Sequence, residues 1–133
     1  MTKVITYGTF DVLHRGHINL LKRAKALGDE LFVGLSSDEF NIGKNKTSVL
    51  PYDDRKCVLE SLYFVDFVFK EEKWDQKIPD VIKYGIDIFV IGDDWKGHFD
   101  FLKPHCEVIY LPRTPGVSTS LLKEKVITMG GRT

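Results

Sequence analysis

Two histidines in the segment GTFDVLHRGH, residues 8–17, have the types and the spacing of a phosphate-binding site. The segment lies between an apolar run and the start of a helical pattern, where the first amides of a helix carry partial positive charge and attract anions. His14 and His17 are three residues apart across that start, and Gly16 leaves room for a phosphate to approach the backbone. Both imidazoles can then donate to one anion and stabilise charge that develops on a reacting phosphoryl group.

Two other interpretations of this histidine pair are open. One histidine could cap the helix or pack against it while the other is solvated, as is usual for an arbitrary pair. A zinc site would need one or two further ligands, and the sequence offers no third histidine or paired cysteine at a suitable spacing. The position of the pair at a strand-to-helix crossing favours the phosphate site.

A second group of anion-binding residues lies near the other end of the chain, just before another helical pattern. One hydroxyl is enough to cap a helix. Three hydroxyls in a row, a glycine that permits close backbone approach and an arginine able to make bidentate phosphate contacts exceed that need. The predicted second phosphate site comprises Arg113, Thr114, Pro115, Gly116, Val117, Ser118, Thr119 and Ser120. The plain alternative is a capped helix beside a solvated arginine.

Strands and helices alternate along the chain, and this order predicts how the two sites are positioned. Apolar runs predict strands at residues 3–7, 31–35, 65–69, 86–91 and 108–111, and a polar stretch predicts an exposed loop at 41–48. Helical spacing predicts helices over 18–27, from Pro51 to about residue 63, over 74–84 with a start or kink at Pro79, and over 121–129. We therefore expect one α/β domain over residues 1–133, with a Rossmann-like doubly wound sheet of about five parallel strands, helices on both faces, and ligands at the carboxyl ends of the strands.

Composition limits the class of protein. The chain has 133 residues, 43% of them hydrophobic, which suffices for one core, and 19 basic residues balance 19 acidic ones, so no nucleic-acid partner is expected. No segment approaches the roughly 20 apolar residues of a membrane span, and the first residues lack a signal-peptide pattern. We expect a cytoplasmic protein without membrane insertion, in which Cys57 and Cys106 are reduced and buried.

Two motifs connect this pattern to a known superfamily. TFDVLHRGH resembles the T-F-D-x-x-H-x-G-H signature of the nucleotidylyltransferases, which binds the phosphates of a nucleoside triphosphate, and RTPGVSTS resembles the R-T-x-G-[IV]-S-[ST] segment that contacts the β- and γ-phosphates. The resemblance implies nucleotide contacts from the second phosphate site and from Thr9, Phe10, Asp11, His14, Arg15, Gly16 and His17.

Three further stretches narrow the resemblance. They are ITYGTFDVLHRGH, SSDEFN followed by Lys44 and Lys46, and IGDDWKGHFDFLK with CEVIYLPRTPGVST. These stretches resemble the glycerol-3-phosphate cytidylyltransferase family, which joins CTP to glycerol 3-phosphate, releases pyrophosphate and supplies CDP-glycerol for teichoic-acid-type polymers. By position, the resemblance implies acceptor contacts from Lys44, Lys77 and Arg55 and nucleotide contacts from Lys46 and Asp94. The catalytic residues so implied are His14, His17, Lys44, Lys46 and Arg113. We expect Mg²⁺ held mainly by the nucleotide phosphates, and the family implies a homodimer.

The sequence departs from the family at two places and leaves other functions open. Tyr63 and Phe64 stand where the family usually has Arg-Tyr, in a segment of its dimer contact, and Pro115 replaces a frequent glutamate. The open alternatives are transfer of CMP to another phosphorylated alcohol such as ethanolamine phosphate, transfer of AMP to a pantetheine-type phosphate, and a non-catalytic nucleotide sensor. The acceptor-side Lys77 argues against the sensor, because a sensor needs no second-substrate site.

Overall fold

The computed structural model describes residues 1–113, in which five parallel strands form one sheet. The strands are β1 (Lys3–Gly8), β2 (Glu30–Ser36), β3 (Phe67–Glu71), β4 (Ile88–Gly92) and β5 (Glu107–Leu111). Their order in the sheet is β3-β2-β1-β4-β5, so the chain first winds outward from β1 to β3 and then returns to place β4 on the other side of β1. The prediction of a doubly wound parallel sheet is confirmed, with its switch point between β1 and β4.

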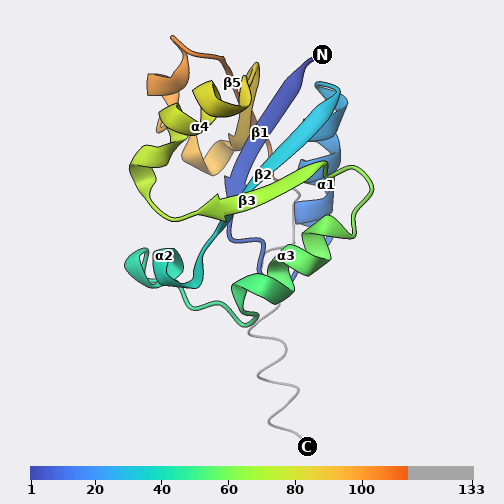
Figure 1. Cartoon of the computed structure of the whole chain (residues 1–133), viewed down its shortest axis with the longest axis vertical. Helices are drawn as coiled ribbons and strands as arrows, with labels where there is room; N and C mark the ends of the chain where they lie inside the picture. The colour runs from blue at the N-terminus through green and yellow to red at the C-terminus, as the bar shows by residue number, and fades with distance from the viewer. Residues whose placement is uncertain (114–133) are drawn as a thin grey trace, which may run out of the picture.

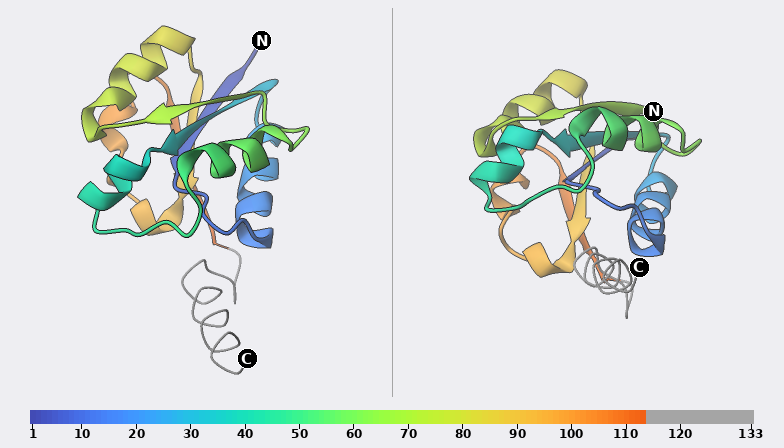
Figure 2. Two further views of the ribbon diagram at one scale, coloured as in Figure 1. Left: turned by 60° about the horizontal axis from the view of Figure 1, so that its bottom comes forward. Right: turned by 90° about the horizontal axis from the view of Figure 1, so that it is seen from below.

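Helices cover both faces of the sheet (Figures 1 and 2). They are α1 (Arg15–Ala26), α2 (Asp38–Gly43), α3 (Tyr52–Glu60) and α4 (Lys77–Tyr84), with 3₁₀ turns at Trp74–Gln76, Asp93–Trp95 and Asp100–Leu102. Leu21 of α1 and Leu59 of α3 share one core with Val4, whereas Val81 of α4 shares the other core with Ile5. Neighbours on β1 serve different cores because successive side chains of a strand point to opposite faces.

Several predicted boundaries differ from the structure, among them that of β3, which covers Phe67–Glu71 in place of residues 65–69. Residues 41–43 belong to α2 and not to a loop, because the Ser37 hydroxyl accepts from the Phe40 amide at 3.0 Å and starts a short helix there. Helix α3 ends at Glu60, and the chain turns through bonds from Leu62 N to Leu59 O and from Val65 N to Leu62 O before β3 begins. The residues after Glu60 that were predicted to continue the helix therefore form this turn. The helix predicted over 121–129 lies outside the described residues.

The two cysteines differ from expectation in burial. Both are free, but Cys57 is exposed and Cys106 is half-buried, so the expectation that both are buried is wrong. On α3, Cys57 lies two residues from Arg55 and two from Leu59, and both of these residues face the interior. Because a helix turns by about 200° over two residues, the Cys57 thiol points outward. Within residues 1–113, no helix has the length and apolar character needed to cross a membrane.

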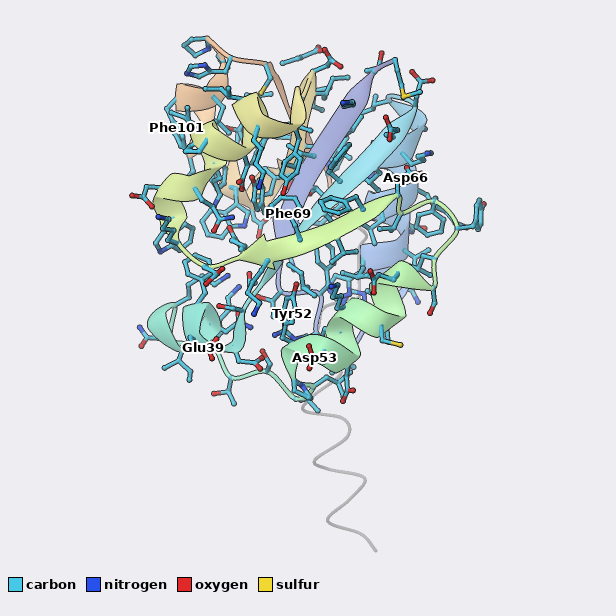
Figure 3. All side chains as sticks on the ribbon, viewed as in Figure 1. Glu39, Tyr52, Asp53, Asp66, Phe69 and Phe101 are labelled. Atoms are coloured by element: carbon cyan, nitrogen blue, oxygen red, sulfur yellow. The ribbon has the colours of Figure 1, made fainter. Side chains whose placement is uncertain are left out.

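One end of the sheet gathers the loops that carry the predicted site. Parallel strands place all their carboxyl ends at the same edge, and α2 and the start of α3 lie there, marked by Glu39, Tyr52 and Asp53 in Figure 3. Asp66 lies toward the opposite edge, where its carboxylate accepts from the Lys25 ammonium and the Leu31 amide, both at 2.7 Å. The carboxyl edge therefore holds the candidate site, while the other edge is tied together by structural bonds.

Candidate active site

A cleft of about 530 Å³ opens at the carboxyl edge between the loop after β1, α1, the loop after α2 and the ends of β4 and β5. It brings together predicted residues from both ends of the sequence. The predicted residues that line it are Thr9, Phe10, Asp11, His14, Gly16, His17, Lys46, Asp94 and Arg113. Arg15 is exposed and does not line it. Thr114, Pro115, Gly116, Val117, Ser118, Thr119 and Ser120 lie outside the described residues.

The loop after β1 is folded tightly beneath the cleft. Phe10 and Val12 adopt positive φ angles of 46° and 50°, a region that β-branched and bulky residues rarely occupy. A Cβ on Gly8 would lie 2.8 Å from the Phe10 ring, so glycine is required for that ring to fold back over the strand end. The Phe10 ring then packs edge-on against His17, with ring centroids 5.5 Å apart. This strain is of the kind that accumulates at binding sites.

The two histidines cap α1 reciprocally. His14 Nδ1 accepts from the Gly16 amide at 3.0 Å, and His17 Nδ1 accepts from the His14 amide at 3.3 Å. Because each Nδ1 acts as an acceptor, the proton of each neutral ring is on Nε2, which makes that atom a donor. The rings are stacked with centroids 4.0 Å apart. The structure therefore combines capping and cleft lining in both residues, in place of one capping and one solvated histidine.

Both imidazoles are held in their neutral form. Burial lowers the pKa of His17 to about 4, and the adjacent His14 adds to the effect. Burial, with Arg15 and Arg113 nearby, lowers the pKa of His14 below its usual value as well. Near neutral pH the cleft is thus lined by two uncharged imidazoles, beside Lys46 and Arg113.

We expect ¹⁵N NMR of the imidazoles to show the Nε2–H tautomer for both His14 and His17, with His17 staying neutral until about pH 4. Because the folded pKa of His17 lies below its unfolded value, the unfolded chain binds more protons between about pH 6.5 and pH 4, and stability is lost as the pH falls through that window. Urea unfolding across that window measures the loss, and a His17→Gln variant should lose less. An Nδ1–H tautomer at His17 would contradict the capping assignment.

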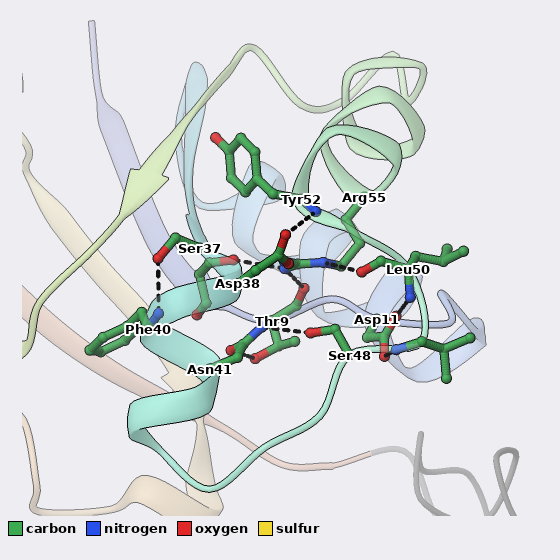
Figure 4. A network of polar contacts seen from close by, with 12 residues as sticks. Thr9, Asp11, Ser37, Asp38, Phe40, Asn41, Ser48, Leu50, Tyr52 and Arg55 are labelled. Carbon is green, nitrogen blue, oxygen red and sulfur yellow. Dashed lines mark hydrogen bonds and ion pairs between the residues drawn. The ribbon is translucent and has the colours of Figure 1, made fainter.

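A buried network fixes the loops around the cleft (Figure 4). Arg55 is 1% exposed, and its guanidinium donates to the carbonyls of Leu50, Thr9 and Ser36 at 2.8–3.0 Å and to the Asp38 carboxylate at 2.7 Å. It does not line the cleft. The predicted acceptor contact of Arg55 does not fit this position, because its donors are directed at protein groups that tie α3 to the ends of β1 and β2.

Asp11 and Thr9 extend the same network. The Asp11 carboxylate is buried and accepts from the amides of Val49 and Leu50 at 2.6 and 3.0 Å. The Thr9 hydroxyl donates to Asn41, whose amide donates in turn to Ser48. Asn41 is a residue that the sequence reasoning missed, because the polar stretch around it reads as an exposed loop. The first motif therefore also shapes the loop that follows α2.

The side chains of the two lysines after α2 point in different directions. Helix α2 ends at Gly43 with Lys44 as its C-cap, and Asn45 adopts a left-handed conformation with φ 58°, which asparagine tolerates better than most residues. The chain turns there, and Lys46 lines the cleft. Lys44 instead donates from Nζ to the Ser36 hydroxyl at 3.0 Å and lies against the rings of Phe40 and Trp74.

Lys44 and Lys77 are connected through the carboxylate of Glu71. Lys77 Nζ lies 2.5 Å from Glu71 Oε2, and the Ser36 hydroxyl donates to Glu71 Oε1 at 2.7 Å. Lys77 is 1% exposed and packs against the rings of Tyr7, Trp74 and Phe99. A second, mostly apolar cavity of about 450 Å³ lies beside it and shares Trp95 with the cleft. The structure thus brings together the two lysines predicted to meet the acceptor.

Several side chains at the site were missed by sequence reasoning. Arg23 of α1 lines the cleft and donates to the Pro112 carbonyl at 3.0 Å, which anchors the chain just before Arg113. Trp95 lines the cleft as well. Glu71 ends β3 at the carboxyl edge, a position that could have identified it had the strand boundary been placed correctly.

Comparison with known proteins agrees with this geometry. Residues 5–125 match the family described as cytidylyltransferase-like. The chain is 58% identical to a protein named glycerol-3-phosphate cytidylyltransferase from Bacillus subtilis, over 95% of this chain and 98% of the relative, and 56% identical to one of the same name from Staphylococcus aureus, over 95% and 96%. The crystal structure of a lipopolysaccharide core biosynthesis protein from Thermoplasma volcanium superposes with a TM-score of 0.75 at 28% identity, over 86% of this chain and 98% of that one. The doubly wound sheet and the two histidines that cap α1 agree with the family match. The chain belongs to the cytidylyltransferase-like family, because the family match covers residues 5–125.

Proposed function

We propose that this protein transfers CMP from CTP to glycerol 3-phosphate and releases pyrophosphate, forming CDP-glycerol. The observation that carries the proposal is the adjacency of two candidate anion sites, since Tyr7 lines the histidine cleft and its ring centroid lies 4.7 Å from Lys77 Nζ. Two adjacent sites suit a transfer between two phosphorylated substrates and exceed what a nucleotide sensor requires. The identity of the substrates is supported by the names of the relatives that are 56–58% identical.

The chemistry needs little more than positioning and charge stabilisation. A phosphate monoester has a second pKa of about 6 and is largely dianionic at neutral pH, so no protein base is required. An oxygen of the acceptor phosphate, held by Lys44 and Lys77, attacks the α-phosphorus of CTP in line. The new bond joins that oxygen to the α-phosphorus, and the bond from the α-phosphorus to the bridging oxygen of pyrophosphate breaks. His14 and His17 donate from Nε2 to the oxygens that gain charge.

Other cations complete the proposed site. Arg113, with Ser118 and Thr119, holds the leaving pyrophosphate, and Lys46 closes over the phosphates from the loop after α2. Mg²⁺ would be carried by the nucleotide phosphates, because this hard cation prefers phosphate and water oxygens. Asp94 in the cleft lining would hold one of its waters. Bound Mg²⁺ would neutralise part of the triphosphate charge.

Pyrophosphate release by the purified protein with Mg²⁺ tests the proposal directly. CTP is compared with ATP, UTP and GTP, and glycerol 3-phosphate with the phosphates of ethanolamine, choline and ribitol and with 4′-phosphopantetheine. We expect release with CTP and glycerol 3-phosphate alone. Release with another pair would keep the mechanism and replace the substrate, whereas no release with any pair, while CTP still binds, would favour the sensor.

We also propose that the protein is a cytoplasmic homodimer whose product serves teichoic-acid-type polymers. Tyr63 is 88% exposed and Phe67 44% exposed, beside and on the edge strand β3, and exposed aromatic side chains of this kind are common at interfaces. The exposed free thiol of Cys57 is compatible with a reducing compartment. Light scattering in solution measures the mass of the assembly.

A further inference from the structure

A buried carboxylate stands between the two acceptor lysines, and the mechanism above does not use it. Glu71 at the end of β3 is 3% exposed. Its Oε2 accepts from Lys77 Nζ at 2.5 Å, and its Oε1 accepts from the Ser36 hydroxyl at 2.7 Å. The same Ser36 hydroxyl accepts from Lys44 Nζ at 3.0 Å. One hydrogen-bonded chain therefore joins Lys44, Ser36, Glu71 and Lys77.

We propose that Glu71 is a positioning residue that holds Lys77 directly, and Lys44 through Ser36, as a pair of ammonium groups that together bind the dianionic phosphate of the acceptor. This inference rests on the proposed function, because it concerns the acceptor side of the same site. It assigns to Glu71 the affinity for the acceptor and not the chemical step.

The charge balance of the cluster points to an anion. A buried ion pair needs one lysine and one carboxylate, and such a pair alone would be a structural feature. Here a second lysine, Lys44, is joined to the same carboxylate only through a hydroxyl, so the cluster carries an excess positive charge in a largely buried place. Aromatic faces of Phe40 and Trp74 stabilise that charge in part. A phosphate dianion would supply the missing negative charge.

The groups that face Lys44 make its protonation depend on Glu71. Burial lowers the pKa of Lys44 to about 8, the carboxylate of Glu71 on β3 raises it, and the positive charges of Lys46 on its own loop, Lys77 on α4 and Arg55 on α3 lower it further. Glu71 is thus the group that opposes burial and three cations. Without its charge, Lys44 would become neutral at a lower pH, and its contact with a dianion would weaken.

Glu71→Gln tests the inference, because glutamine keeps the shape and can still accept from Ser36 while it removes the charge. At saturating CTP we expect the KM for glycerol 3-phosphate to rise on the order of tenfold, as for one lost charge-assisted contact, with a smaller change in kcat. The basic limb of kcat/KM for the acceptor should move to lower pH, and the KM for CTP should change less than about twofold. Glu72→Gln, on the adjacent exposed residue, is the matched control and should match the wild type.

Two further measurements keep the result decisive. Glu71→Asp retains the charge, so its basic limb should stay at the wild-type pH even if its turnover falls, and it replaces the glutamine variant if that variant does not fold. Calorimetric binding of glycerol 3-phosphate without CTP should be weaker in Glu71→Gln than in the wild type.

An unchanged acceptor KM and pH profile in a folded Glu71→Gln protein, while the wild type is active, would overturn the inference and leave the proposed function standing. A wild type that transfers no CMP to glycerol 3-phosphate would instead overturn the proposed function.

Discussion

Replacing His14 by alanine is expected to lower kcat by about 10²–10³-fold, the usual cost of removing one donor that stabilises charge in a transition state. The Nδ1 atom of His14 accepts from the Gly16 amide, so in the proposed mechanism Nε2 is the atom that donates to the reacting phosphate. Steady-state pyrophosphate release measures the loss. His17→Ala should behave similarly, because His17 has the same arrangement with the His14 amide.

An asparagine variant separates the helix-capping role of His14 from its proposed role as a donor to the phosphate. Asparagine places an oxygen near the Nδ1 position and is a strong N-cap, but it lacks the Nε2 donor. We therefore expect His14→Asn to unfold at a urea concentration close to that of the wild type and to turn over as slowly as His14→Ala. Recovery of turnover in His14→Asn would show that the cap, and not the donor, limits the alanine variant. His105→Ala, at an exposed histidine that does not line the cleft, should leave kcat unchanged.

Arg55→Met is expected to lower the free energy of unfolding by about 3–5 kcal/mol, because it leaves several backbone acceptors without a donor. The substitution leaves the carbonyls of Leu50, Thr9 and Ser36 without this donor, and the Asp38 carboxylate loses its ion pair with the guanidinium. Because Asp38 is itself 45% exposed, water can replace part of that last bond, and most of the loss comes from the carbonyls. Urea unfolding followed by circular dichroism measures the change.

The neighbouring residue on α3 supplies the control for Arg55. Lys56→Met changes an adjacent charged side chain and should alter stability by less than about 0.5 kcal/mol. Arg55→Lys should recover only part of the loss, since an ammonium cannot reach all four acceptors of a guanidinium. An Arg55→Met variant that is as stable as the wild type and has only a raised KM for the acceptor would contradict this structural role. That result would support the acceptor contact that the sequence predicts for Arg55.

Much of this site could be predicted from the sequence because its determinants are local. Apolar runs and helical spacing depend on neighbours within a few residues, and they were sufficient for the alternation of strands and helices and hence for the parallel sheet. The spacing of His14 and His17 across a helix start is equally local, and their reciprocal capping forms within three residues. The position of this loop after the first strand placed it at the carboxyl edge without any knowledge of the packing.

What only the tertiary structure decided depends on register and on the rotation of each helix. The ends of β1, β2 and β3 align so that Ser36 and Glu71 meet, and α4 turns Lys77 toward them, which no spacing along the chain encodes. The same applies to Arg55, whose acceptors come from three separate segments. The sequence by itself determined the chemistry of the phosphate-binding loop, because that loop is built from consecutive residues. The tertiary structure decided which cations meet around one carboxylate and which are structural, because those contacts exist only once distant strand ends are brought to the same edge.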